Sequence, residues 1–90
     1  MQEETLDVKQ KFKKALAQVV KRHRKEQQKS ISKISAEIMM TKSMWTDLES
    51  GIKDPQLTTI WKISEALNIP LENIIKEIKD ILGKDFTLID

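Results

Sequence analysis

The sequence predicts an all-α protein in which five helices pack around one small core. Apolar residues recur at steps of three and four along five segments, the spacing of helices that each bury one face. Both glycines and both prolines fall between these segments, where they end helices instead of interrupting them. Ninety residues can bury only a thin core, so a second copy of the chain would add useful buried surface.

The first helix is predicted from about residue 6 to residue 28, after a polar start at residues 1–5 that is expected to fray. Neither proline nor glycine interrupts this segment. Lysines and arginines crowd the rest of its surface and repel one another. Its apolar stripe consists of Phe12, Ala15, Leu16, Ala17, Val19 and Val20.

The stretch Ser30–Gly51 holds two short helical patterns with almost nothing between them. Ser30 and Thr41 are the predicted N-caps, because a hydroxyl at that position accepts a free backbone N–H of the first turn. Gly51 tolerates a left-handed backbone just past the second helix. The first pattern turns Ile31, Ile34 and Ile38 inward, while the second turns Trp45 and Leu48 inward and Lys42, Ser43, Thr46 and Asp47 outward. Helices of about ten residues are unstable alone, so both must pack on their neighbours.

Two further helices follow a loop at residues 52–55. The fourth runs from about residue 57 to residue 67, and its broad apolar surface predicts a central position with Trp61 buried. Asn68 in a left-handed conformation and Pro70 are expected to end it. The fifth is predicted at Leu71–Leu82, before an apolar tail at residues 86–89, with an apolar stripe formed by Ile74, Ile75, Ile78, Ile81 and Leu82. This stripe exceeds what a small core needs, so we expect helix five and the tail to form a dimer contact; alternatively, they only close the domain.

Composition argues against several classes of protein. Cysteine is absent, so neither disulfides nor a thiolate metal site are expected. No apolar run approaches the roughly 20 residues of a membrane span and no signal peptide is visible, which predicts a cytoplasmic protein without membrane contact. His23, the single histidine, is expected at the surface or the edge of the core. With no glycine-rich phosphate loop, metal-ligand spacing or nucleophile–base cluster, we expect no enzyme activity, cofactor, metal or small-molecule ligand.

Positive charge is concentrated in one part of the chain. Residues 9–33 hold ten of the sixteen Lys and Arg residues and a single acid, Glu26, although the net charge is only +2. A basic run alone usually marks a solvent-exposed helix face. Beside the pair of short helices, it indicates a surface that binds a polyanion.

Two short helices with a polar outer face on the second have the layout of a helix-turn-helix unit, whose second helix can enter a DNA major groove. Ser30–Gly51, the following Asp54-Pro55-Gln56-Leu57 and the apolar run to Leu67 resemble the helix-turn-helix domain of the phage Cro/repressor (XRE-like) family. The cluster Leu48-Glu49-x-Gly51-x-x-x-Pro55 is fairly specific. The resemblance implies a compact five-helix lambda-repressor-like DNA-binding domain at residues 11–75 with its motif at 30–51. Residues 1–10 would form an extension and the start of helix one, and residues 76–90 the end of helix five and the tail.

Three residues depart from the family pattern. Met39 stands where the turn usually has glycine, Ser35 where the first motif helix has alanine, and Ile31 where that helix begins with glutamine. Met39 either holds a left-handed conformation at about 1 kcal/mol of strain, or the turn is remodelled. The resemblance also implies that Arg24 pairs with Glu49 and ties the first helix to the end of the second motif helix. The other interpretation of Arg24 is an exposed contact to phosphate.

The resemblance places Lys42 and Ser43 at base-reading positions, where lysine donates to guanine O6 and N7 and serine serves either type of partner. Thr46 offers a methyl or a hydroxyl one turn further on, and Asp47 can accept from cytosine N4 although it repels phosphate. The alternative interpretation is that Lys42, Ser43, Thr46 and Asp47 are ordinary solvent-exposed residues of the helix. The expected phosphate contacts are Ser30, Thr41 and Lys53. The expected structural residues are Arg24, Trp45, Leu48, Glu49 and Gly51.

We therefore interpret the chain as a sequence-specific, double-stranded DNA-binding transcriptional regulator. The expected form is a small repressor that binds a palindromic operator as a homodimer through the major groove. Two other interpretations stay open. One is an antitoxin of a toxin–antitoxin pair, in which helix five and the tail bind a toxin. The other is a protein-interaction module that kept the fold and lost DNA binding.

Overall fold

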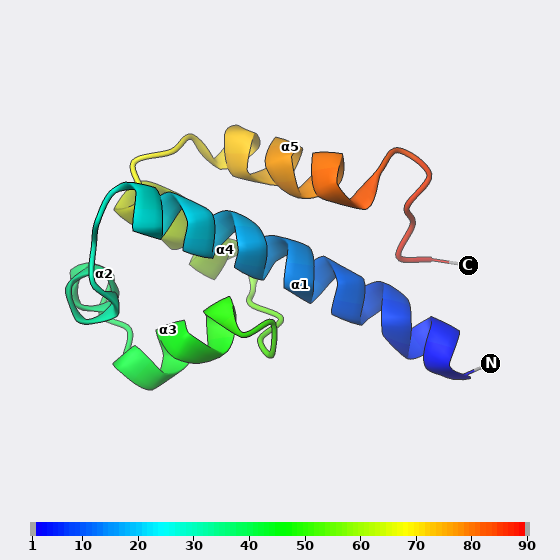
Figure 1. Ribbon diagram of the computed structural model, residues 1–90, viewed down its shortest axis with the longest axis horizontal. Coiled ribbons are helices and arrows are strands. Elements are labelled where there is room, and N and C mark those ends of the chain that lie inside the picture. Colours follow the sequence, from blue (N-terminus) through cyan, green and yellow to red (C-terminus); the bar gives the residue numbers. More distant parts are fainter. Residues whose placement is uncertain (1, 90) are drawn as a thin grey trace.

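The computed structural model describes residues 2–89, with side chains from residue 8 onward. Its helices are α1 (Gln2–Glu26), α2 (Ile31–Glu37), α3 (Lys42–Glu49), α4 (Leu57–Ala66) and α5 (Leu71–Leu82), and no strand occurs in this part of the chain. The long α1 crosses the molecule with α5 along one side and α2 and α3 on the other, while α4 lies behind it (Figure 1). The predicted all-α, five-helix fold is confirmed.

One hydrophobic core joins all five helices. The predicted stripe of α1 supplies its centre, where Leu16 and Val20 are fully buried. Because every other helix also buries at least one apolar side chain there, the short α2 and α3 are stabilised by packing and not by their own length. The core residues from beyond α1 are Ile34, Trp45, Leu48, Ile60, Ile63, Ala66, Leu67, Ile74 and Ile78.

The helix boundaries follow the sequence signals closely. Helix α1 begins at Gln2, earlier than predicted, because neither proline nor glycine stands in its first turns. The left-handed residue Gln28, with φ 58°, follows its end. Asn68 is left-handed beyond α4, with φ 56°, and α5 has the predicted bounds.

Two predictions about burial were wrong. Trp61 is 54% exposed, because α4 packs on the core through the face that carries Ile60 and Ile63 and not around its whole girth. In α5, Ile74 and Ile78 are buried in the core and are not part of a surplus surface. Helix α5 lies along α1, so these two isoleucines fill the space between the helices of one chain. Ile81, one turn further, remains half exposed.

Polar contacts join α1 to α5. His23 Nε2 lies 2.9 Å and 3.1 Å from the two carboxylate oxygens of Glu77, and Arg22 also donates to that carboxylate. The His23 side chain is mostly covered at the edge of the core, as predicted. These contacts hold the solvent side of the α1–α5 interface, whose inner side is apolar.

The loop after α1 caps the C-terminal end of α4. Gln27 Nε2 donates to the Leu67 carbonyl at 2.6 Å, and Lys29 Nζ donates to the Ala66 carbonyl at 2.9 Å. The last carbonyls of a helix have no partner within the helix, so these side chains satisfy groups that would otherwise be unpaired. Lys29 therefore serves the fold, although it belongs to the basic run.

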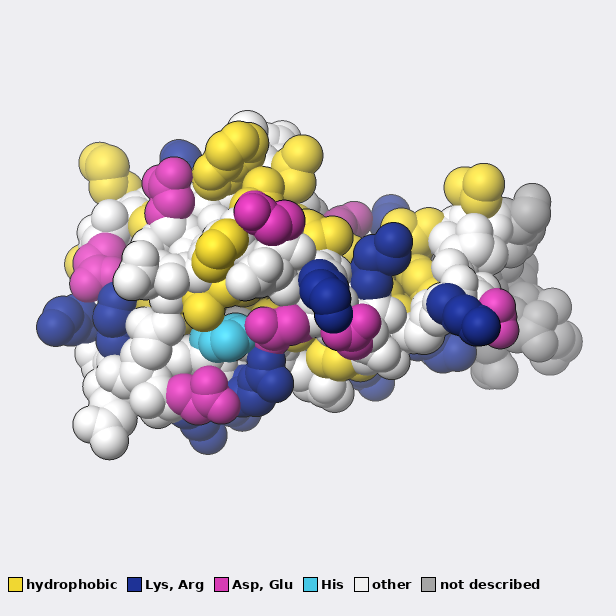
Figure 2. Space-filling view, turned by 90° about the horizontal axis from the view of Figure 1, so that it is seen from above, with side chains coloured by type: hydrophobic (Ala, Val, Ile, Leu, Met, Phe, Trp, Pro, Cys, Tyr) yellow, Lys and Arg dark blue, Asp and Glu magenta, His cyan; other side chains and the backbone are white. Residues whose placement is uncertain are grey.

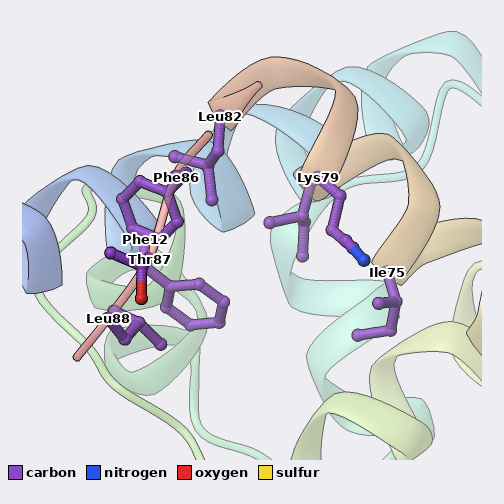
Figure 3. Close-up of a pocket in the computed structure, with 8 residues that line it drawn as sticks. Phe12, Ile75, Lys79, Leu82, Phe86, Thr87 and Leu88 are labelled. Carbon is purple, nitrogen blue, oxygen red and sulfur yellow. The ribbon is translucent and has the colours of Figure 1, made fainter. Parts of the chain in front are cut away.

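The tail after α5 folds back beside α1. Phe86 and Leu88 lie near Phe12, while Ile75 and Lys79 line the opposite wall of a shallow apolar cavity of about 340 Å³ (Figure 3). Leu88 and Ile89 keep more than half of their surface exposed. The tail covers part of the apolar surface of α1 and α5 and adds exposed apolar surface of its own.

Candidate nucleic-acid interface

The two motif helices begin at hydroxyl caps, as predicted. The Ser30 Oγ accepts the backbone N–H of Lys33 at 3.1 Å, and the Thr41 Oγ1 accepts that of Met44 at 3.0 Å. Ser30 and Thr41 are themselves exposed. Each hydroxyl uses an acceptor lone pair for the cap, so its hydrogen is still available to donate to an anion.

The turn between α2 and α3 keeps its left-handed residue. Met39 has φ 58°, and its side chain is 95% exposed. The backbone N–H of Met40 closes the end of α2 on the Ser35 carbonyl at 2.9 Å. Of the two alternatives for Met39, the structure therefore adopts the strained residue, at about 1 kcal/mol, and not a remodelled turn.

The other two departures from the family pattern are accommodated locally. Ser35 is buried, and its Oγ donates to the Ile31 carbonyl at 2.6 Å, so no hydroxyl is left unpaired in the core. Ile31 packs part of its side chain against the core. It has no polar side-chain group with which to bind phosphate or bases.

Helix α3 has one anchored face and one exposed face. Trp45 and Leu48 are buried, while Lys42, Ser43 and Thr46 are exposed. Asp47 is half buried, and the backbone carbonyl of that residue accepts the N–H of Ile52 at 3.1 Å. Three of the four predicted base-contacting residues are thus exposed, and the fourth is partly covered.

A buried ion pair fixes α3 relative to α1. Arg24 Nε and Nη2 donate to the two carboxylate oxygens of Glu49 at 2.6 Å and 2.9 Å. Trp45 Nε1 donates to the same carboxylate at 2.6 Å, and Arg24 Nη1 donates to the Lys29 carbonyl at 2.8 Å. The hydrogen bond to Glu49 raises the pKa of Arg24, burial opposes the rise, and the negative charge of Glu49 adds to it. The pair implied by the resemblance therefore forms, and Arg24 faces the protein instead of solvent.

The loop after α3 is fastened to α1 at Gly51. This residue has φ 76°, and a Cβ there would lie 3.4 Å from Lys14 Cγ. Gln10 Nε2 also donates to the Gly51 carbonyl at 3.1 Å. Glycine is favoured there by the left-handed backbone, since a Cβ would meet Lys14 only at ordinary van der Waals distance. Lys53 follows in the loop and is exposed.

Within the basic run at residues 9–33, some positive charges form ion pairs in the fold and others do not. Arg24, Arg22 and Lys29 pair with Glu49, Glu77 and Glu37, and Lys9 lies 3.8 Å from Asp54. Lys14, Lys21, Lys25 and Lys33 are exposed without an ion pair to any residue whose side chain the structure describes. Part of the basic run therefore stabilises the fold, and these four lysines are open to solvent.

On the α5 face of the molecule, many hydrophobic side chains gather along one edge (Figure 2).

Met44 is an exposed apolar residue that none of the predictions from the sequence included. This residue lies on α3, and 44% of its surface is exposed. The available signal was an apolar residue at the third position of the helix, one turn before Leu48. The capping roles of Gln27 and Lys29 had no comparable local signal.

The part of the chain with described side chains contains no group of three or more His, Asp or Glu residues that could hold a metal ion. None of the helices searched is long and apolar enough to cross a membrane.

The capped helices, the tight turn and the exposed polar face of α3 define a helix-turn-helix domain. Residues 20–74 match the helix-turn-helix family HTH_3. The chain belongs to this family, which confirms the resemblance found in the sequence.

One solved structure is similar over most of the chain, an HTH_3 family transcriptional regulator from Vibrio cholerae. The TM-score is 0.73 at 23% sequence identity, over 86% of this chain and 43% of that chain. The present chain thus spans less than half the length of that regulator, and the likeness is one of fold. No curated protein sequence matches the chain.

Proposed function

We propose that the chain is a sequence-specific regulator, a small repressor that inserts α3 into the major groove of double-stranded DNA. The observation that carries this proposal is the contrast between the two faces of α3. Its inner face is fastened by Trp45, Leu48 and the Arg24–Glu49 pair, while Lys42 and its polar neighbours stay exposed. A rigid helix whose donors are free before binding loses little entropy when it meets base edges.

In this proposal, Lys42 and Ser43 read bases at the end of α3 that enters the groove. Thr46 and Asp47 lie one turn further along, where threonine can meet a thymine methyl and aspartate a cytosine amine. Ser30, Thr41 and Lys53 bind phosphates and set the register of the domain on the duplex. The proposed compartment is the cytoplasm.

We propose that two copies bind a palindromic operator. Exposed apolar side chains on α4, α5 and the tail support a contact between copies, because burying them in a partner interface is favourable. They are Leu57, Trp61, Ile81, Leu88 and Ile89. A two-fold dimer presents its two α3 helices to half-sites about 34 Å apart, which is why a palindrome is expected. A repressor of this kind acts by occupying its operator.

The test is selection of bound duplexes from a random DNA pool, followed by titration of the enriched and scrambled duplexes. We expect an enriched palindrome bound by two chains. Absence of any enriched sequence would refute the regulator.

The dimer has a separate test. Trp61→Glu should shift sedimentation toward the monomer with helicity retained, because a charge replaces an apolar contact. Lys62→Glu, a change at the neighbouring exposed position, is the matched control and should leave the dimer intact. If the parent protein is a monomer at every concentration tested, the homodimer is wrong. A stable monomer that prefers no duplex would favour the protein-interaction module, with a protein partner of another kind at the same apolar residues.

A further inference from the structure

Met44 is an apolar side chain at the end of α3 that the proposed function inserts into DNA. Its backbone N–H is the group capped by Thr41 Oγ1, which places it at the third residue of the helix. With 44% of its surface exposed, it follows Lys42 and Ser43 in the first turn of α3 and lies one turn before the buried Leu48. Leaving a large apolar side chain there is unfavourable in water, so the site gains stability from an apolar ligand.

A small cleft lies beside Met44. Its volume is about 130 Å³, and its lining consists of Met40, Met44, Leu48, Lys53, Pro55 and Thr59. The walls come from the turn, from α3, from the following loop and from α4; Leu48 belongs to the core, and Met40 packs against it. The cleft exceeds the roughly 30 Å³ that a water molecule occupies in the liquid, and a methyl group is of similar size. Lys53, which is exposed, also contributes to its lining.

The major groove offers one apolar feature among its hydrogen-bonding groups, the 5-methyl group of thymine. We propose that Met44 and this cleft read the 5-methyl group of a pyrimidine in the operator, while Lys53 binds a phosphate beside it. This inference rests on the proposed function, since it requires α3 to lie in the major groove. It assigns sequence discrimination to a side chain without any hydrogen-bonding role.

The test removes the methyl group without changing base pairing. In the selected duplex, each thymine in turn is replaced by uracil, and the dissociation constant is measured for the parent protein and for Met44→Ala. At one thymine per half-site, the loss of the methyl group should weaken parent binding about fourfold. Met44→Ala should bind the thymine and uracil duplexes equally, and Met44→Leu should keep most of the difference. At the same position, 5-methylcytosine should bind more tightly than cytosine in the parent protein only.

Met39→Ala is the matched control, because Met39 is a more exposed methionine that does not line the cleft. It should keep the parent ratio of uracil to thymine binding. The inference is overturned if no thymine shows a methyl effect, or if Met44→Ala keeps the parent ratio. In both cases a parent protein that still prefers the selected duplex leaves the proposed function standing. A parent protein that prefers no duplex overturns the proposed function and this inference together.

Discussion

Breaking the Arg24–Glu49 pair should cost far more than breaking an ion pair at the surface. Only 11% of the Arg24 side chain and 6% of the Glu49 side chain are exposed. Arg24→Met removes two of the three hydrogen bonds that the Glu49 carboxylate accepts and leaves a buried charge. Truncating one partner of such a pair costs about 3–5 kcal/mol.

Removing both charges should be less damaging than the two single changes suggest. Glu49→Leu also leaves a buried cation, and it deprives Trp45 Nε1 of its acceptor. The double mutant Arg24→Met/Glu49→Leu buries no charge; it leaves the indole N–H unpaired, at about 1–3 kcal/mol, and removes the donor to the Lys29 carbonyl, which Arg24→Met alone removes as well. We therefore expect a coupling free energy of at least about 2 kcal/mol between the two positions.

Urea and thermal unfolding of the parent protein, both single mutants and the double mutant measure this coupling. In a domain of this size, each kcal/mol lowers Tm by about 4–8 °C. Arg22→Met is the matched control, because Arg22 pairs with Glu77 while 53% of its own side chain is exposed, and it should cost about 1 kcal/mol or less. Single-mutant losses that add within about 0.5 kcal/mol would refute the reasoning.

The direction in which the Arg24–Glu49 pair's contribution to stability changes with pH follows from the pKa of Arg24. The hydrogen bond to Glu49 raises the pKa of Arg24 in the folded protein. A raised pKa stabilises the folded state at every pH below the ordinary pKa of arginine. This stabilisation is lost only as the pH rises through the pKa that Arg24 has in the folded protein. Between about pH 6 and pH 9, the difference in unfolding free energy between the parent protein and Arg24→Met should therefore gain no slope from arginine titration.

Three further predictions concern other parts of the molecule. Lys42→Ala should cost about 1–3 kcal/mol of binding free energy on the selected duplex and much less on scrambled DNA. Lys53→Ala should weaken binding to both duplexes alike and lower the slope of log K against log salt concentration by about one. Equal losses on both duplexes for Lys42→Ala would show that Lys42 does not read bases. Ile78→Asp should abolish helicity by circular dichroism, because Ile78 is 2% exposed; a folded monomer would contradict its core position. Met39→Gly should raise the unfolding free energy by up to about 1 kcal/mol in urea denaturation, since glycine relieves the strain at φ 58°; a loss of stability would count against that strain.

Local signals were enough to locate the helices. Ser30 and Thr41 mark the starts of α2 and α3, and Gly51 and Asn68 mark the backbone reversals after α3 and α4. Each of these residues acts on backbone groups a few positions away, so its role can be recognised without knowing the rest of the fold. The contrast between the faces of α3 was equally visible, because it depends only on helical periodicity.

Helical periodicity did not predict which neighbouring helix covers each residue of an apolar face. Ile60 and Trp61 are neighbours on the same apolar helix, yet one is buried and the other is half exposed. Likewise, Ile78 lies in the core while Ile81, one turn away, does not. A stripe shows that a helix has something to bury, but its width does not show which neighbouring helix covers each residue.

The sequence by itself determined the five helices, the helix-turn-helix motif and the polar outer face of α3, because these follow from caps, turn residues and periodicity within a few residues. Only the tertiary structure decided which apolar side chains remain exposed on α4, α5 and the tail, and that a cleft forms beside Met44. It also decided which positive charges are taken up within the fold, such as those of Arg24 and Lys29. These features depend on contacts between segments far apart in the chain, which no local pattern encodes.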